Sequence, residues 1–196
     1  FGTPVTGGNV SFYNETLGEG VYPTPVLGII GLMKTHKPIP MRFQNAGRKL
    51  VLVGGLLPGA SDQIERRFGS SQFAKVVLRQ IWGLPPALDM DYEKRVQAAV
   101  RRIVNLDLAE SAHDASDGGL AVTVAECCSH IGARVELRST LPAHYLLFHE
   151  APSRVLVSVE PAALRSVLEI ADQHRVEAPV IGETVSGELR FRVNGI

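Results

Sequence analysis

Beyond the first quarter of the chain, short apolar stretches alternate with longer stretches whose apolar residues recur every three or four positions. The short stretches are typical of buried strands, and the longer ones of helices that bury one face. Val96, Ala99 and Ile103 define one such face, and Asp89 or Asp91 can cap the helix that carries them. The pattern predicts strands at 49–53, 111–115, 134–137, 154–159, 180–184 and 189–193, and helices at 72–82, 92–108, 119–131 and 161–174.

This alternation of strands and helices predicts an α/β (α+β) fold in which helices pack against a mixed sheet. The last two strands, joined by Ser186 and Gly187, are expected to run antiparallel. The helix predicted at 161–174 starts with Pro161, which suits a first helical turn because the N–H that proline lacks needs no partner there.

The beginning of the chain follows a different pattern. Up to Lys34 the only charged residues are Glu15 and Glu19. The stretch Tyr22–Met33 is apolar and contains glycine, which is typical of a buried strand approached closely by another backbone. Such a strand needs partner strands, and the region before it is too short to supply them. We therefore expect an apolar edge around Val26–Leu32 to be exposed in this chain.

This contrast predicts two parts. Residues 1–46 are expected to be the tail of a domain whose other strands lie elsewhere, together with a linker at 35–47 that contains Pro38 and Pro40. Residues 47–196 are expected to form an α/β domain.

Composition and charge narrow the class of protein. The 20 basic and 20 acidic residues give a formal net charge of zero, which argues against a basic nucleic-acid-binding face. With 45% hydrophobic and 20% charged residues, the chain is not intrinsically disordered. No apolar run approaches the roughly 18 residues of a membrane span, and no basic segment typical of a secretory signal precedes Lys34. We therefore expect a cytoplasmic protein that binds neither membrane nor nucleic acid.

The two cysteines, Cys127 and Cys128, are adjacent in the sequence, where an ordinary disulfide between them is strained. No second cluster of cysteine and histidine accompanies them, so they do not indicate a zinc site. We expect both to be reduced, as in a cytoplasmic protein.

The stretch from Thr6 to Glu15 is the first candidate for chemistry. Gly7 and Gly8 allow a backbone to approach a ligand, Asn9 offers an amide oxygen to a hard cation, and Ser11 offers a hydroxyl to a phosphate. Glycine and asparagine also suit a tight turn in which polar side chains bond locally. The residues alone leave both readings open.

The second candidate is the stretch from Ser111 to Leu120, which contains His113, Asp114, Ser116 and Asp117. A strand that ends in carboxylates and a histidine is followed by glycines that open a helix, and helix N-termini bind anions. In the alternative, Ser116 or Asp117 caps the helix and His113 pairs with a nearby carboxylate. Two weaker candidates for anion contact are Gly69–Gln72 and Phe148–Arg154, for which a helix cap and a turn are the alternatives.

Several motifs of other enzyme classes are absent. The chain has no G-x-x-x-x-G-K-[ST], G-x-G-x-x-G, H-E-x-x-H or G-x-S-x-G, so any use of ATP does not depend on a P-loop.

Three stretches resemble phosphoribosylformylglycinamidine synthase, an enzyme family of purine biosynthesis. They are Pro4-Val5-Thr6-Gly7-Gly8-Asn9-Val10-Ser11-Phe12-Tyr13-Asn14-Glu15, Tyr22-Pro23-Thr24-Pro25-Val26 and Ala112-His113-Asp114-Ala115-Ser116-Asp117-Gly118-Gly119-Leu120-Ala121. The resemblance covers essentially the whole chain but only the C-terminal part of the family enzyme. It implies a C-terminal domain of the aminoimidazole ribonucleotide synthetase type, preceded by the last strands of an N-terminal-type domain.

The resemblance also implies an activity. The family enzyme converts formylglycinamide ribonucleotide, ATP and glutamine to formylglycinamidine ribonucleotide, ADP, phosphate and glutamate, with Mg²⁺ bound and with ammonia supplied by a glutaminase subunit or domain. Matched to this sequence, the family pattern places Gly8 at ATP, Asn9 at Mg²⁺ and Ser11 at the ribonucleotide substrate. It assigns no role to His113, Asp114 or Asp117. Relatives tend to have Gly-Gly-Ser where this chain has Gly69-Ser70-Ser71.

Two other functions remain open at this point: a small-molecule kinase of the same superfamily, and a scaffold domain that keeps the fold without catalysis. In the leading interpretation the chain needs the missing N-terminal half, which carries the family's histidines and most metal ligands. By itself the chain is then expected to be inactive and to hold no catalytic residue.

Overall fold

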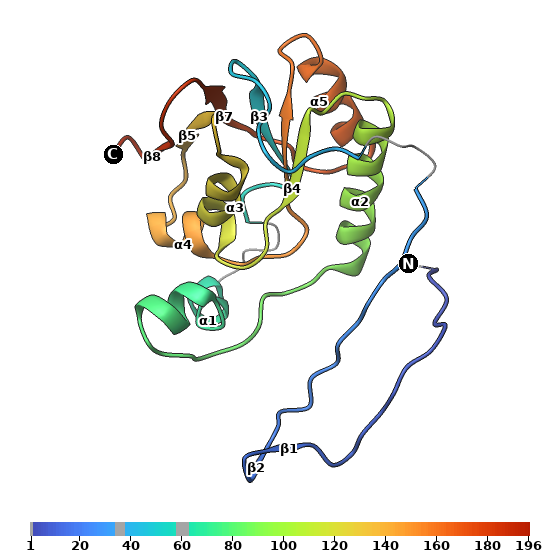
Figure 1. The fold of residues 1–196 in the computed structure, drawn as a ribbon. Coiled ribbons are helices and arrows are strands. Elements are labelled where there is room, and N and C mark those ends of the chain that lie inside the picture. The colour runs from blue at the N-terminus through green and yellow to red at the C-terminus, as the bar shows by residue number, and fades with distance from the viewer. Residues whose placement is uncertain (1, 34–37, 58–62) are drawn as a thin grey trace. The chain divides into compact units, whose positions relative to one another are not determined.

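The computed structural model describes residues 2–33, 38–57 and 63–196. The chain forms two compact units, divided between residues 38 and 39, which we describe separately (Figure 1).

The described part of the first unit is mostly extended chain. Its regular structure is a short antiparallel hairpin of β1 (Glu15–Thr16) and β2 (Glu19–Gly20). Leu17 and Gly18 turn the hairpin with φ of 55° and 84°, the left-handed region that such turns require.

The strand predicted at Tyr22–Met33 does not form. A strand is stabilised by hydrogen bonds to neighbouring strands, and no other described strand pairs with this stretch. The expected exposure of its apolar side chains is confirmed, since Val26 is 93% exposed and Ile30 is 96% exposed. Residues 35–37 of the expected linker lie outside the described residues.

The described part of the second unit contains a sheet of six strands in the order β4-β6-β3-β7-β5-β8. All neighbours are antiparallel except β5 and β8, so the prediction of a mixed sheet is confirmed. The strands β7 and β8 run in opposite directions as expected, but β5 lies between them and pairs with both. The strands are β3 (Lys49–Val53), β4 (Ser111–Asp114), β5 (Gly132–Leu137), β6 (Val155–Val159), β7 (Val180–Val185) and β8 (Arg190–Val193).

Helices connect these strands, and the prediction of an α/β fold is confirmed. Asp89 caps α2 by accepting hydrogen bonds from the N–H groups of Asp91 and Tyr92. The predicted helix at 72–82 is only a π-helical turn, because Arg79 adopts a φ of 55° that ends it. The helices are α1 (Ile64–Phe68), η1 (Phe73–Val77), α2 (Met90–Asn105), α3 (Gly119–Cys127), α4 (Ala143–Phe148) and α5 (Leu164–Gln173).

The core has two layers because the side chains of β3 alternate between the faces of the sheet. Leu50 and Leu52 pack in a cluster with residues of α3 and α4, whereas Val51 and Val53 pack with residues of α2 and α5. The two pairs of helices lie on opposite sides of the sheet (Figure 1). Cys127 is buried in the first cluster as a free thiol, and burial raises its pKa to about 12. Among the described residues, no helix is long and apolar enough to cross a membrane.

Candidate functional site

The three residues matched to ATP, Mg²⁺ and substrate lie in the first unit. Gly8, Asn9 and Ser11 are all exposed. The Ser11 hydroxyl donates to the carbonyl oxygen of Tyr13 at 2.7 Å, and the Tyr13 hydroxyl donates to the Glu15 carboxylate. These contacts are local ones of the kind that a turn provides, and all three residues remain accessible from solvent. The roles of these residues remain predictions.

The second candidate lies in the second unit, where β4 leads into α3. His113 is held between two carboxylates, with Nε2 3.0 Å from Oε2 of Glu126 and Nδ1 3.4 Å from Oδ1 of Asp114. The expected pairing of His113 with a nearby carboxylate is therefore confirmed. Because Glu126 belongs to α3, this contact joins the strand to the helix that follows it.

Asp114 is kept ionised by its neighbours. The Ser116 hydroxyl donates to its carboxylate, and this hydrogen bond is the main reason that the pKa of Asp114 lies below its usual range. Burial opposes this shift, while the adjacent His113 adds to it. Asp117 follows as an exposed residue immediately before the helix.

The residue that caps the start of α3 is not one of those expected. Neither Ser116 nor Asp117 is the capping residue; the N-cap is Gly118, with φ of 81°. A side chain at Gly118 would be strained by this φ, and a Cβ would come within 2.4 Å of the Val122 side chain. The Gly118 N–H donates instead to the carboxylate of a distant residue, Glu150, at 2.8 Å.

Glu150 joins three stretches that the sequence presented as separate candidates. Its Oε1 atom accepts from Gly118 N–H and also from Gln72 N–H at 2.7 Å, next to η1. Two of the candidate sites for anion contact are thus brought together, and a carboxylate of the protein itself accepts from a backbone N–H group of each. Ser71 provides the cap expected for the segment after Gly69, since its Oγ accepts from Ala74 N–H at 3.2 Å.

The loop that carries Glu150 is fixed by Arg154, which is only 2% exposed. Its guanidinium donates to the carbonyl oxygens of Ala151 at 2.9 Å, His149 at 2.6 Å and Leu56 at 3.1 Å. Burial lowers the pKa of Arg154 to about 10, while the charge of Glu150 raises it, so the group stays protonated at neutral pH. The expectation of a surface turn here is wrong, because Arg154 is a buried cation that binds the main chain.

His149 is neutral in this setting. Burial, together with the charges of Arg154 and Arg67, lowers its pKa to about 4. Its Nδ1 atom is buried without a hydrogen-bond partner among the described residues. The ring lies near Phe68, with 6.2 Å between the ring centroids. His149 therefore packs as an apolar ring, a role that the sequence does not reveal.

The described residues contain no group of three or more histidine, cysteine, aspartate or glutamate side chains arranged to hold a metal ion. Asn9 contributes one amide oxygen, a ligand type that Mg²⁺ accepts. The role of Asn9 at Mg²⁺ therefore remains a prediction.

Comparison with known proteins gives a consistent match. Residues 45–194 match the model of the family described as AIR synthase related protein, C-terminal domain. The phosphoribosylformylglycinamidine synthase subunit PurL of Moorella thermoacetica is 43% identical over 196 residues, which are 98% of this chain and 26% of the relative. The PurL subunit of Synechococcus elongatus is 43% identical over 173 residues, 83% of this chain and 22% of the relative. The chain thus spans about a quarter of the length of the curated relatives it matches.

Solved structures share the fold. Thermotoga maritima PurL complexed with FGAR superposes with a TM-score of 0.63 at 24% identity, over 80% of this chain and 27% of that chain. The hydrogenase maturation protein HypE of E. coli gives a TM-score of 0.53 at 17% identity, over 82% of this chain and 50% of its own. At these identities the likeness establishes the architecture of the second unit.

Proposed function

We propose that this chain, which belongs to the family of C-terminal domains of AIR synthase related proteins, is the C-terminal part of an ATP-dependent ligase of purine biosynthesis. The reaction is the conversion of formylglycinamide ribonucleotide to formylglycinamidine ribonucleotide, with ATP cleaved to ADP and phosphate. The observation that carries this proposal is the 43% identity to a PurL subunit over 98% of the chain. The relatives named PurL favour this ligase over a kinase or a scaffold domain.

The stretch of Gly8, Asn9 and Ser11 is the part of the site that this chain supplies. The backbone at Gly8 lies against the nucleotide, the Asn9 amide oxygen binds Mg²⁺, and the Ser11 hydroxyl binds the ribonucleotide. Magnesium would neutralise charge on the phosphates when bound. The exposure of all three residues supports this proposal, since a second part of the protein can reach them.

The remaining candidates act on the shape of the site. His113 and Asp114, with Asp117 near them, position α3 relative to β4, since His113 contacts Glu126 in the last turn of α3 at 3.0 Å. We assign residues 1–46 to the tail of an N-terminal-type domain and its linker, and residues 47–196 to the C-terminal-type domain. The missing N-terminal half and an ammonia-supplying glutaminase are the partners, and the enzyme works in the cytoplasm without binding nucleic acid or membrane.

Steady-state kinetics of the full-length enzyme test the site. Asn9→Leu should lower kcat and weaken the response to Mg²⁺, because it removes a metal ligand. Ser11→Ala should raise KM for the ribonucleotide by about tenfold or more with less effect on kcat, as expected for one hydrogen bond to a charged group. Asn105→Leu and Ser186→Ala, at exposed positions outside the proposed site, are the matched controls.

The proposal fails if both site variants stay within about threefold of the wild type while remaining folded, a difference of only about 0.65 kcal/mol. The 196-residue chain by itself should show no turnover of ATP with the ribonucleotide. Turnover by this chain alone would contradict the assignment of the catalytic groups to the missing part.

A further inference from the structure

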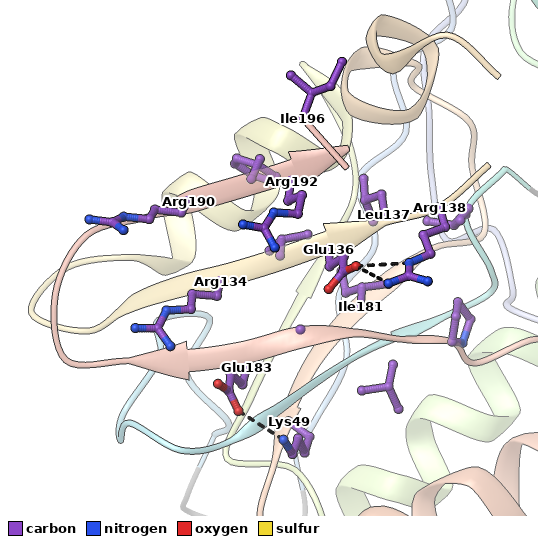
Figure 2. A pocket seen from close by; sticks show the side chains of 16 residues that line it. Lys49, Arg134, Glu136, Leu137, Arg138, Ile181, Glu183, Arg190, Arg192 and Ile196 are labelled. Carbon is purple, nitrogen blue, oxygen red and sulfur yellow. Dashed lines mark hydrogen bonds and ion pairs between the residues drawn. The ribbon is translucent and has the colours of Figure 1, made fainter. Parts of the chain in front are cut away.

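One end of the sheet has an uncovered face. The core cluster of α2 and α5 includes side chains of β3 and β6 but, within the described residues, none of β5, β7 or β8. A hollow of about 1000 Å³ lies over these uncovered strands (Figure 2). Five of its lining residues are cations, and we call them the basic face: Lys49, Arg134, Arg138, Arg190 and Arg192.

The basic face carries more positive charge than its own carboxylates balance. Glu183 pairs with Lys49 at 3.1 Å, and Glu136 pairs with Arg138 at 2.7 Å. These are the two acidic residues of the lining, so its five cations exceed its carboxylates by three, although the chain as a whole is neutral. Glu136 also stands opposite Arg192, and its pKa is lowered mainly by the hydrogen bond from Arg138, with the charge of Arg192 adding to this shift. The positive charge of this face is therefore balanced by acidic residues elsewhere in the chain.

The register of the strands places one pair of like charges side by side. Arg134 on β5 stands opposite Arg190 on β8, and like charges in this position destabilise a sheet. Glu183 stands opposite Arg134 on the other side of β5, and offsets part of this repulsion. Arg190 forms only a long ion pair, with 3.8 Å between its guanidinium and the carboxylate of the exposed Glu188. An acidic surface over these arginines would remove the repulsion, and arginine is enriched where protein surfaces meet.

We propose that this basic face binds an acidic surface of the part of the polypeptide that the chain lacks. This inference rests on the proposed function, in which the chain is one part of a longer synthetase. The chain covers 26% of the PurL relative from M. thermoacetica, so most of such a protein lies outside it. Contacts between domains of one polypeptide are more polar than permanent subunit interfaces, which suits a face where cations surround apolar residues such as Val180 and Ile196.

The arrangement of the arginines favours a broad acidic surface over a small anion or a nucleic acid. The side chains of Arg134, Arg190 and Arg192 lie along two strands and point in different directions, so they do not converge on one phosphate (Figure 2). Phe191 is the aromatic residue of the lining, and it packs against the core instead of offering its ring to a base.

Arginine-selective labelling with phenylglyoxal, read by mass spectrometry, tests the proposal. In the 196-residue chain all three arginines should react at the rate of exposed side chains. In the full-length polypeptide they should react about tenfold more slowly, and 1 M salt should remove this protection because it screens charges beyond about 3 Å. Equal labelling in the two proteins would overturn the proposal, as would protection that appears only after pyrophosphate or RNA is added.

A charge reversal provides the second measurement. In the full-length protein, R134E/R190E/R192E should speed hydrogen exchange across β8 by about tenfold, because the acidic surface no longer covers it. The reversal also places acidic residues opposite Glu183 and Glu136 within the sheet, so the same variant of the 196-residue chain measures this local loosening, and only the additional acceleration in the full-length protein supports the proposal. The control for net charge is R101E/R102E/R165E, which makes the same charge change at exposed positions of α2 and α5. If the reversal and the control exchange equally, the face is not an interface. Turnover of ATP with the ribonucleotide by the wild-type protein is measured separately, so failure of the proposed function is recognised independently.

Discussion

Removal of the Glu150 carboxylate is the most direct test of the contacts that organise the second unit. Its Oε1 atom accepts from the N–H groups of Gln72 at 2.7 Å and Gly118 at 2.8 Å. In Glu150→Ala both donors lose their acceptor. A hydrogen bond to a charged group contributes about 1.5–3 kcal/mol, and a donor left without a partner costs a similar amount. Because both N–H groups are only part-buried, water can replace part of the lost hydrogen bonding. We therefore expect the free energy of unfolding to fall by about 2–4 kcal/mol.

Glu150→Gln separates the acceptor from its charge. The amide retains one oxygen that can accept both N–H groups, so we expect a smaller loss of about 1–2 kcal/mol. Urea unfolding of the full chain gives the free energies, and hydrogen exchange at Gln72 and Gly118 shows whether the two amides open locally. Glu169→Ala is the control, since it removes only a surface pair with Arg165 and should change stability by less than about 1 kcal/mol.

The reasoning is refuted if Glu150→Ala lies within about 0.5 kcal/mol of the wild type, which is the scatter of ordinary surface substitutions. It is also refuted if the alanine and glutamine variants lose the same stability, because the shared acceptor would then have no role.

Three further changes test residues near this loop and at the start of α2. His149 has a pKa of about 4 in the folded protein, whereas in the unfolded chain a histidine takes up its proton below about pH 6.5. The free energy of unfolding should therefore decrease as the pH falls from about 6.5 to about 4, by about 2–3 kcal/mol at most. Urea titrations at pH 7 and 4.5 should show a smaller fall for His149→Phe. Arg154→Met leaves three carbonyl oxygens without their donor and should cost about 3 kcal/mol or more in thermal unfolding, with Arg154→Lys less affected. Asp89→Ala should cost about 1 kcal/mol by loss of the α2 cap, as measured by urea unfolding.

Much of the second unit follows from local patterns. The helix α2 has its apolar face and its cap within its own segment, and both Asp89 and the buried Val96 are as predicted. The apolar run of β3 likewise predicts a buried strand. The short helices α1 and α4 were not predicted, because five or six residues give too little periodicity to distinguish a helix.

The contacts that organise the candidate site depend on residues far apart in the sequence. Nothing in the sequence near Glu150 indicates that its carboxylate accepts hydrogen bonds from the N–H groups of Gln72 and Gly118. Likewise, nothing near Arg154 indicates that it donates to the carbonyl oxygen of Leu56. Charged residues beside Pro152 read as a surface turn, since burial of arginine is rare. The stretch Tyr22–Met33 fails for the opposite reason: its pattern is that of a strand, but pairing requires strands beyond those described here.

The place of β5 between β7 and β8 has a consequence for synthesis on the ribosome. Val135 pairs with Gly182 on one side and with Phe191 on the other, so neither neighbour of β5 exists until the chain has passed residue 180. At translation rates of roughly 5–20 residues per second, β5 waits roughly 2–10 s with both edges unpaired. The alternation of Arg134 and Glu136 with apolar residues places charge on this nascent strand, and charged side chains on open edges discourage pairing with other chains. The sheet can close only after the last strand, Arg190–Val193, has emerged, so this domain completes its sheet late in its own synthesis.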